Sequence, residues 1–433
     1  MLEADYLILG AGAMSMSFAD VILREDANAS IVMVDRRAAP GGHWNDAYPY
    51  VRLHQPAAFY GVNSAKLGRG GSDLVSGGEI LDYYARTMDR FQADGRLRFL
   101  ASTEHRGSGG LVSLEHPDRV TRVTAARRVV DGTYMHVQVP ATRAPQYSVD
   151  DEATLRAPNG LVDDDGGRAL YVVIGAGKTG IDAILFLLDR GVPPERVRWV
   201  MPNDAWLWDR ATVQPGGCLS TIETFVECLY GTDDPFSSLE ARGVVCRLDE
   251  RRRPTRWRCA TVDRDELARL RTVEDVVRLG RVRNVHPDRL ELDDGVVACP
   301  EDTLFVDCTA DGLAKRPRLP VFADGRVTLQ PVFMCQQTFS AAAVAHLELS
   351  AISDARRNRI CAPVAHPERD EDLGPILSTS IQNMLNLNRH SPLWLRRSRL
   401  FNAHHEPLVR YVAGCARITR LQRRARRRQA ALA

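Results

Sequence analysis

Two glycine-rich segments, each preceded by an apolar strand-like run, constrain the fold of this chain more than any other feature. The first reads Tyr6-Leu-Ile-Leu-Gly10-Ala-Gly12-Ala-Met-Ser15, and a near-copy, Tyr171-Val-Val-Ile-Gly175-Ala-Gly177-Lys-Thr-Gly180, occurs much later. A glycine loop between a buried parallel strand and a helix is how α/β domains bind the pyrophosphate of a dinucleotide. The chain is therefore predicted to hold two dinucleotides, as an electron relay requires.

The composition is that of an ordinary globular protein of two or three domains. The chain has 433 residues, of which 44% are hydrophobic and 26% charged, and its formal net charge is +2. This balance gives no reason to expect a nucleic acid partner. Five arginines crowd between Arg423 and Arg428, and we interpret this run as a solvated terminal helix, with an anionic partner as the alternative.

The sequence also indicates where the protein is located in the cell and in what state its cysteines are. No stretch reaches the roughly 18 apolar residues that a membrane-spanning helix needs, so we expect a cytoplasmic protein without membrane contact. The nine cysteines include no Cys-x-x-Cys pair, which argues against a zinc ribbon, a disulfide scaffold and a dithiol reductase. We expect them to be reduced and mostly packed. The oligomeric state stays open, with a homo-oligomer as one option.

The residues around each glycine loop predict a complete βαβ unit. The expected strands and helices are 5–9, 13–23 and 31–34 in the first unit, and 170–174, 179–190 and 197–201 in the second. Residues 40–78 are rich in Gly, Pro, Asn and Ser, which is typical of a long functional loop. Residues 96–139 alternate as in an antiparallel meander, and Asp294-Gly295 predicts the turn of a hairpin.

Each position of the first loop has a physical role in such a site. Gly10 makes the tight turn, Gly12 lets the backbone approach the pyrophosphate, and the following helix directs its N–H groups at that anion. Ser15 replaces the usual third glycine, and its small side chain still permits close helix–strand contact. Asp35, after the second strand, is expected to accept a hydrogen bond from a ribose 2′-OH, with Arg36 flanking the adenosine.

The next run, Pro40-Gly-Gly42-His-Trp44, points to FAD as the first dinucleotide. Its glycines permit a turn tight against the isoalloxazine, and Trp44 offers a flat apolar surface. With this run the chain resembles the flavin-containing monooxygenase family, in which a glycine loop for FAD precedes a Gly-Gly-x-Trp element and an inserted second Rossmann domain binds NADPH. The resemblance extends in layout over residues 1–350.

The resemblance implies an α/β fold: an FAD-binding Rossmann-like domain with an inserted, second Rossmann-like NAD(P)-binding domain and a helical C-terminal region. The expected bounds are 1–165 and 286–350 for the two segments of the FAD-binding domain, 166–285 for the NAD(P)-binding domain and 351–433 for the C-terminal region. A strand ending at Asp307-Cys-Thr-Ala310 resembles the family's crossover back into the FAD-binding domain.

The same resemblance indicates residues beside the flavin. Asn63-Ser-Ala-Lys66 looks like the family element whose asparagine lies next to the flavin C4a position, which makes Asn63 the catalytic candidate. The alternative for Asn63 is a loop asparagine that satisfies a turn. Gln55, in Leu53-His54-Gln55-Pro56, is expected to contact the flavin or the nicotinamide, whereas His54 is equally well explained as a buried loop residue.

The second loop has the features of a nicotinamide site. It keeps all three small positions, Gly175, Gly177 and Gly180, and adds Lys178 and Thr179, which can donate to phosphate. No acid stands directly at the end of the following strand, which reads Met201-Pro-Asn203-Asp204, and this favours NADPH over NADH. The arginine expected near a 2′-phosphate is also missing there, so Arg210 or Asn203 is considered in its place.

One family element is absent. The Phe-x-Gly-x-x-x-His segment expected before the second loop is replaced by Pro145-Gln-Tyr147-Ser-Val149, which argues against Baeyer–Villiger activity. The resemblance implies an FAD-dependent, NADPH-reduced monooxygenase that uses molecular oxygen, through a C4a-(hydro)peroxyflavin, on a small-molecule substrate with a nucleophilic nitrogen or sulfur. The alternatives are a dehydrogenase or reductase of the same fold and a non-catalytic, redox-sensing flavoprotein.

Overall fold

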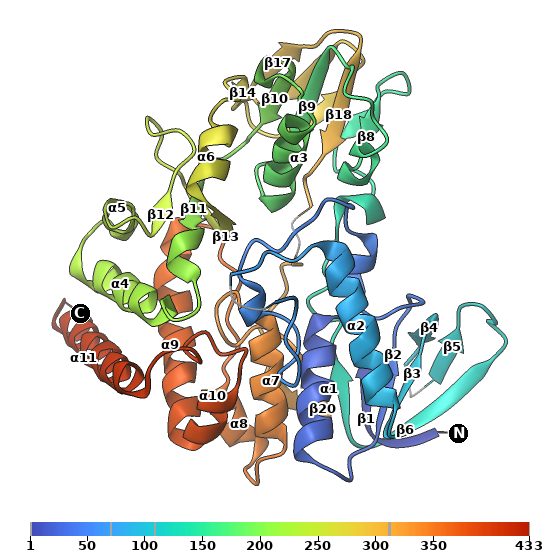
Figure 1. The fold of residues 1–433 in the computed structure, drawn as a ribbon, viewed down its shortest axis with the longest axis vertical. Coiled ribbons are helices and arrows are strands. Elements are labelled where there is room, and N and C mark those ends of the chain that lie inside the picture. Colours follow the sequence, from blue (N-terminus) through green and yellow to red (C-terminus); the bar gives the residue numbers. More distant parts are fainter. Residues whose placement is uncertain (1, 70–71, 108–109, 311–312, 433) are drawn as a thin grey trace.

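The computed structural model describes residues 2–69, 72–107, 110–310 and 313–432, with the backbone alone for 425–432 (Figure 1). Both βαβ units form where the sequence places them. The first is β1 (Leu2–Leu9), α1 (Ala13–Glu25) and β2 (Ile31–Val34), and the second is β9 (Leu170–Ile174), α3 (Lys178–Asp189) and β10 (Val197–Val200). The strands β2 and β9 are continuous apolar runs and are fully buried, because both faces of the sheet are covered at these strands.

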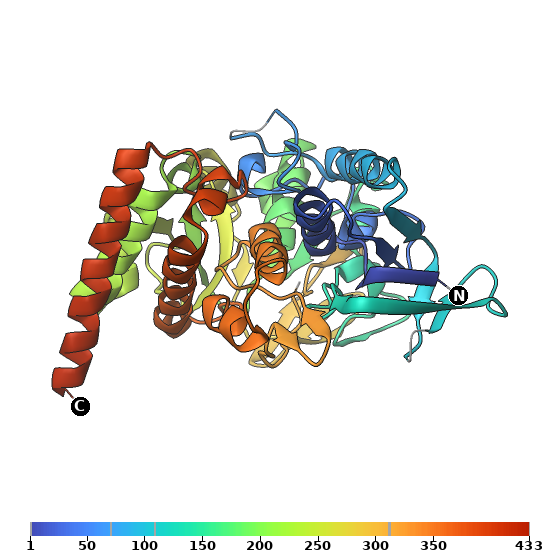
Figure 2. The ribbon, with the colours of Figure 1, turned by 90° about the horizontal axis from the view of Figure 1, so that it is seen from below.

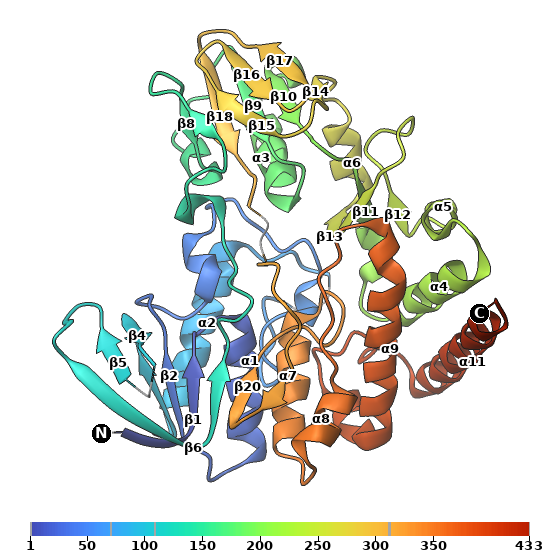
Figure 3. The same cartoon turned by 180° about the vertical axis from the view of Figure 1, so that it is seen from behind.

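The first sheet is built around β1, which pairs in parallel with β2 and with β6. The other elements of this part are α2 (Gly77–Gln92), β3 (Leu97–Leu100), β4 (Thr103–His105), β5 (Gly110–Ser113), β6 (Val120–Asp131), β19 (Phe322–Ala323), β20 (Arg326–Thr328) and α7 (Gln337–Glu348). The main strand order is β19-β20-β6-β1-β2-β3, and β4 and β5 extend the sheet beside β6. Helices α1 and α7 lie side by side against one face (Figure 3).

The second sheet has the order β14-β10-β9-β18-β8 and all its pairings are parallel. The elements that complete this part are β7 (Ser148–Val149), β8 (Leu155–Arg156), α6 (Arg264–Leu270), β14 (Val276–Val277), β15 (Val282–Val285), β16 (Arg289–Leu292), β17 (Gly295–Ala298) and β18 (Thr303–Asp307). Alternate residues of the sheet pack on α3 and α6 on one face and on the β17-β16-β15-β7 sheet on the other.

A third region joins a small sheet to the C-terminal helices. It contains β11 (Ala205–Asp209), α4 (Cys218–Gly231), α5 (Pro235–Ala241), β12 (Val245–Cys246), β13 (Arg256–Val262), α8 (Asp354–Ile360), α9 (Leu373–His390), α10 (Pro392–Arg397) and α11 (Leu408–Leu432). Helix α11 packs along α4 and forms one edge of the molecule, far from the N-terminus (Figure 2). The terminal arginine run is thus helical, although the side chains of Arg426, Arg427 and Arg428 lie outside the described part.

The segment expected to return to the first domain, 286–350, is divided between the two sheets. The hairpin β16–β17 and strand β18 belong to the second part, and the turn of the hairpin is Asp293-Asp294, one residue before the predicted Asp294-Gly295. The strands β19 and β20 and helix α7 join the first part, where β20 pairs with β6. The division arises because β18 is the central partner of β9, a pairing that local sequence does not reveal. Among the described helices, none is both long and apolar enough to cross a membrane.

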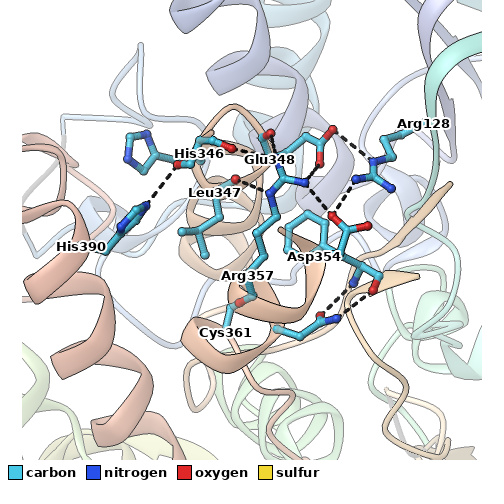
Figure 4. Close-up of polar contacts among 11 residues, drawn as sticks. Arg128, His346, Leu347, Glu348, Asp354, Arg357, Cys361 and His390 are labelled. Carbon is cyan, nitrogen blue, oxygen red and sulfur yellow. Dashed lines mark hydrogen bonds and ion pairs between the residues drawn. The ribbon is translucent and has the colours of Figure 1, made fainter. Parts of the chain in front are cut away.

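Helix α7 ends in a buried network of charges (Figure 4). Arg357 of α8 donates to the backbone oxygens of Leu347, Glu348 and Ser350 at 2.6–2.8 Å and to Asp354 at 2.6 Å. Arg128 of β6 donates to Glu348 at 3.2 Å and to Asp354 at 2.8 Å. Burial raises the pKa of Glu348 although both guanidinium groups oppose this shift. The network fixes the C-terminus of α7, whose N-terminus borders the site described next.

Candidate functional site

The first glycine loop forms a tight cradle at the N-terminus of α1. Gly10 adopts a φ of 85°, and Gly12 is the residue before the first turn of α1, with no side chain capping that turn. Gly42 lies against Gly12: a Cβ on Gly42 would approach the Gly12 Cα to 2.9 Å. The Gly-Gly-x-Trp element therefore folds directly onto the glycine loop, and the N–H groups of the first turn stay available for an anion.

The other residues expected around the first nucleotide take distinct positions. Ser15 is fully buried against Gly132, where a Cβ would lie 1.9 Å from the serine Oγ. Asp35 accepts from the Ala11 N–H at 2.6 Å and from the Arg37 N–H at 2.8 Å, so its carboxylate ties β2 to the glycine loop. Arg36 points to solvent, with its side chain 73% exposed.

The loop after the cradle connects both nucleotide loops. Trp44 donates its indole N–H to the Tyr60 hydroxyl at 2.7 Å. Further on, the Tyr48 hydroxyl donates to Asp182 of α3 at 2.7 Å, and Asp182 also pairs with Lys178. Tyr50 stacks on Phe186 of α3 with 4.0 Å between ring centroids. The loop that starts beside the first glycine loop is thus docked, through Tyr48 and Tyr50, on the helix that follows the second.

The second glycine loop is shaped like the first. Gly175 has a φ of 124° and its carbonyl oxygen accepts from the Trp199 indole at 2.9 Å. A Cβ on Gly180 would lie 2.1 Å from the same oxygen, so glycine is required for this close approach. Gly177 faces open space and no side chain caps the first turn of α3, where Lys178 and Thr179 lie.

An apolar cavity of about 140 Å³ lies between the first part and the third region, of which α4, β13 and α9 contribute to its wall. Its wall is mostly aromatic and aliphatic, and none of its lining side chains is an Asp, Glu, Lys or Arg. The polar groups in the wall include His54 and Gln55 from the loop and Gln336 at the N-terminus of α7. The helix directs its positive end toward this wall, which suits an anionic or electron-rich group.

His54 is held neutral in the cavity wall. Burial lowers the pKa of its imidazole to about 3, assisted by the positive charges of Lys178 and Arg210. Its Nδ1 is buried and has no hydrogen-bond partner. Since a buried polar atom without a partner is costly, this nitrogen is suited to a bound molecule. From the sequence, His54 could be either a proton carrier or a packed loop residue. Its lowered pKa favours a neutral group that forms hydrogen bonds.

Acidification should destabilise the protein through His54. An unfolded histidine takes up a proton below its usual pKa, whereas the buried imidazole does not until about pH 3, so stability is lost as the pH falls from about 6.5. Replacement His54→Gln should reduce this pH dependence by up to about 1.4 kcal/mol per pH unit. Urea unfolding of both proteins across this range tests the prediction. Their free energies of unfolding should change with pH in the same way above pH 7, and an equal change per pH unit below about 6.5 would contradict the assignment.

Asn63 lies away from the cavity wall. Its side-chain oxygen accepts from the Ser398 hydroxyl at 2.9 Å and from the Leu400 N–H at 3.4 Å. The neighbouring Arg399 donates to the backbone oxygens of residues 58, 60 and 62. Asn63 thus joins the loop to the C-terminal region, while Gln55 is the amide of this loop that lines the cavity.

Arg210 does not face the second nucleotide loop as a free cation. Its guanidinium is buried and pairs with Asp263 and Glu266, and it donates to the His54 carbonyl at 3.2 Å. Another arginine, Arg278, was not expected from the sequence. It directly follows β14, lies beside the end of β10, and donates to Asp204 at 2.9 and 3.0 Å. The parallel pairing of β14 with β10 brings Arg278 to this place, and nothing in the local sequence indicates that pairing.

The expectation that all cysteines are reduced is wrong for one pair. A disulfide joins Cys259 of β13 to Cys335, just before α7, and both residues line the cavity. The seven other cysteines are free. The pair was invisible in the sequence because its members come from different parts of the fold, 76 residues apart.

The architecture is that of flavin-dependent monooxygenases of known structure. OTEMO, in a complex with FAD and NADP, superposes with a TM-score of 0.52 at 15% identity, covering 79% of this chain and 83% of OTEMO. Cyclohexanone monooxygenase from Rhodococcus sp. Phi1, bound to NADP+, superposes with a TM-score of 0.50 at 13% identity, covering 90% of each chain. These similarities show a shared fold with two Rossmann-like domains.

Closer relatives occur among mycobacterial proteins. Rv2000 of Mycobacterium tuberculosis (strain H37Rv) and Mb2023 of Mycobacterium bovis, both named as uncharacterized proteins, are each 42% identical over 421 residues. The match covers 92% of this chain and 78% of each relative. The chain belongs to the family of these mycobacterial proteins. No protein-family model matches the sequence.

Proposed function

We propose that this protein is an FAD-dependent monooxygenase, reduced by NADPH, that acts on a small substrate with a nucleophilic nitrogen or sulfur. The observation that carries the proposal is the path of the loop over residues 40–78. It begins with Gly42 packed on the first glycine loop, docks through Tyr48 on Asp182 beside the second, and supplies His54 and Gln55 to the apolar cavity. One segment therefore connects both nucleotide sites to one reaction chamber.

The residues around the first loop fit FAD. The cradle leaves no room for a side chain at Gly10 or Gly42 but is open at Gly12, before the uncapped first turn of α1, which suits a pyrophosphate. Asp35 is placed to accept from a ribose hydroxyl if it exchanges one of its two backbone partners. OTEMO, which shares the fold, binds FAD and NADP, and this supports the same cofactors here.

The residues around the second loop fit a nicotinamide dinucleotide. Gly177 leaves open space at the uncapped start of α3, as a second pyrophosphate requires. Arg278 and Asn203 lie at the carboxyl ends of β14 and β10, where the 2′-phosphate of NADPH would lie in a Rossmann-like domain. We assign the phosphate contact to Arg278, whose guanidinium would exchange its pairing with Asp204 for the phosphate, because it lies at the end of β14 beside β10, whereas Arg210 is more deeply buried between two carboxylates.

The chain's own residues would orient and enclose the reaction. A bound flavin supplies hydride acceptance and oxygen activation. The apolar wall excludes water, and the uncharged lining of the cavity favours a neutral substrate. Neutral His54 offers an unpaired Nδ1, Gln55 offers an amide, and the N-terminus of α7 would favour negative charge on a flavin ring bound beside it.

Spectroscopy of the purified protein tests this function in steps. A flavin absorption spectrum that bleaches on anaerobic addition of NADPH would establish the electron path. Rapid mixing of the reduced protein with oxygen should then give a transient species unlike either oxidised or reduced flavin. Incorporation of labelled oxygen into product would separate oxygenation from a dehydrogenase or reductase. Immediate return to oxidised flavin under every condition would overturn the monooxygenase, and absence of bleaching would favour the redox-sensing alternative.

Replacement of Arg278 should change the preference between electron donors. Arg278→Met removes the guanidinium assigned to the 2′-phosphate, and we expect NADPH to bind about 10- to 100-fold more weakly, as for a lost charge-assisted contact. NADH lacks that phosphate, so its affinity should change little. Anaerobic titrations of flavin reduction with both donors measure the effect. Arg283→Met, at an exposed arginine of β15, serves as the control, and equal losses for both donors would contradict the assignment.

A further inference from the structure

The Cys259–Cys335 disulfide is the covalent link between two parts of the cavity wall. Cys259 belongs to β13, in the small sheet β12-β11-β13, whereas Cys335 belongs to the turn that leads into α7. Both residues line the cavity, Cys259 being buried and Cys335 half-buried. The bond therefore holds the small sheet against the part of the first domain from which α7 begins.

Cys259 lies in an irregular part of its strand. In the pairing of β11 with β13, Trp206 lies opposite Trp257 and Trp208 lies opposite Thr261, so β13 carries extra residues at this point. Cys259 has a φ of 58° and Cys335 a φ of 55°. Side chains with a Cβ rarely adopt this left-handed region, and they keep it only where their surroundings impose it. The bulge turns Cys259 out of the ladder and toward the cavity.

The two ends of the bridge are anchored unequally. The turn before α7 is fixed by side chains: Ser340 Oγ accepts from the N–H groups of Val332 and Phe333 at 3.1 Å, and Ser380 Oγ accepts from Met334 at 3.0 Å. The bulge around Cys259 is fixed at its flanks: the Trp257 N–H donates to the Glu368 carbonyl at 3.0 Å, Arg258 pairs with Glu368 at 3.8 Å, and the Thr261 carbonyl accepts from Arg210 at 3.4 Å. At the apex of the bulge, the Cys259 carbonyl accepts from the Thr261 hydroxyl at 3.2 Å. Without the disulfide, this apex, Cys259 and Ala260, is the part that can relax.

We propose that Cys259 and Cys335 form a redox-active pair whose reduction by a dithiol releases Cys259 and Ala260 and loosens the wall of the cavity. A thiolate of the dithiol attacks one sulfur, the Cys259–Cys335 bond breaks, and a mixed disulfide forms. The second thiol of the reductant resolves it, so the dithiol is oxidised to a disulfide while both cysteines gain a proton and become thiols. The step draws no electrons from a bound flavin and stands apart from the proposed function.

Peptide mapping and hydrogen exchange of the full-length protein test the proposal. Without reductant, a non-reducing digest should contain the Cys259–Cys335 cross-linked peptide, and dithiothreitol should remove it. Amide exchange over residues 256–262 should then rise by roughly tenfold or more, whereas exchange over 332–340 should change little. Cys259→Ser and Cys335→Ser should each show the fast exchange with or without dithiothreitol. Cys299→Ser, which removes a buried free cysteine of the second part, should respond like the wild type.

Three results would overturn the proposal. The first is absence of the cross-linked peptide from protein kept without reductant. The second is reduction of the pair with no change in exchange over residues 256–262. The third is faster exchange over 332–340 alone, which would place the mobile end at α7 instead. The wild-type measurements with and without dithiothreitol decide the matter even if the serine variants fold poorly.

Discussion

Replacement of Arg357 by methionine is expected to lower the free energy of unfolding by about 3–5 kcal/mol, the cost of breaking a buried ion network on one side. Methionine keeps much of the volume but leaves the buried Glu348 carboxylate with Arg128 alone. It also removes the donors to the backbone oxygens of Leu347, Glu348 and Ser350 at the end of α7. Urea unfolding at neutral pH measures the loss.

The neighbouring arginine provides a matched control. Arg356 is on the same helix but is exposed, so Arg356→Met should change stability by less than about 0.5 kcal/mol. A loss of similar size in both variants would mean that α8 is sensitive to any change of charge. A negligible loss in Arg357→Met would show that the network contributes little beyond its own desolvation cost.

Valine at two glycine positions is expected to separate the two nucleotide sites. Gly42→Val places a Cβ 2.9 Å from the Gly12 Cα at a φ of 60°, so the protein should lose its FAD. Gly180→Val places a Cβ 2.1 Å from the Gly175 oxygen, so FAD should stay bound while the rate of reduction by NADPH falls by about 100-fold or more, as for a misplaced reactant. The flavin-to-protein absorbance ratio and anaerobic reduction rates measure both effects.

Gly78 supplies the control for these substitutions. A Cβ at Gly78 meets no atom within 4 Å, so Gly78→Val should keep both FAD and the reduction rate. If Gly180→Val loses FAD as readily as Gly42→Val does, the two loops do not serve separate nucleotides. Circular dichroism would distinguish this result from unfolding of the whole chain.

The elements around the glycine loops could be predicted closely because local pattern determines them. The strand over residues 170–174 is a run of five buried residues, and the structure gives these same bounds. The hairpin was predicted from Asp294-Gly295, and it forms with its turn one residue earlier, at Asp293-Asp294, because Leu292 pairs with Gly295. In both cases the residues that decide the structure are neighbours in the chain, so their sequence contains the necessary information.

Long-range contacts explain what could not be predicted. Arg210 looked available near the second loop until its partners Asp263 and Glu266, more than 50 residues later, were placed beside it. The partners of Asn63 come from the C-terminal region around Ser398. A single sequence gives no measure of such distances, so a residue type with suitable chemistry cannot be distinguished from one already engaged by a remote partner.

The loop over residues 40–78 is docked on α3, so movement of the second domain is coupled to the shape of the cavity. Tyr48 and Tyr50 attach the loop to the second domain, while the packing of Gly42 on Gly12 holds its start in the first. His54 and Gln55 follow only a few residues later in the cavity wall. A rotation of one domain against the other would therefore pull on the residues that line the cavity, so that, under the proposed function, nucleotide exchange at the second loop would reach the cavity through this segment.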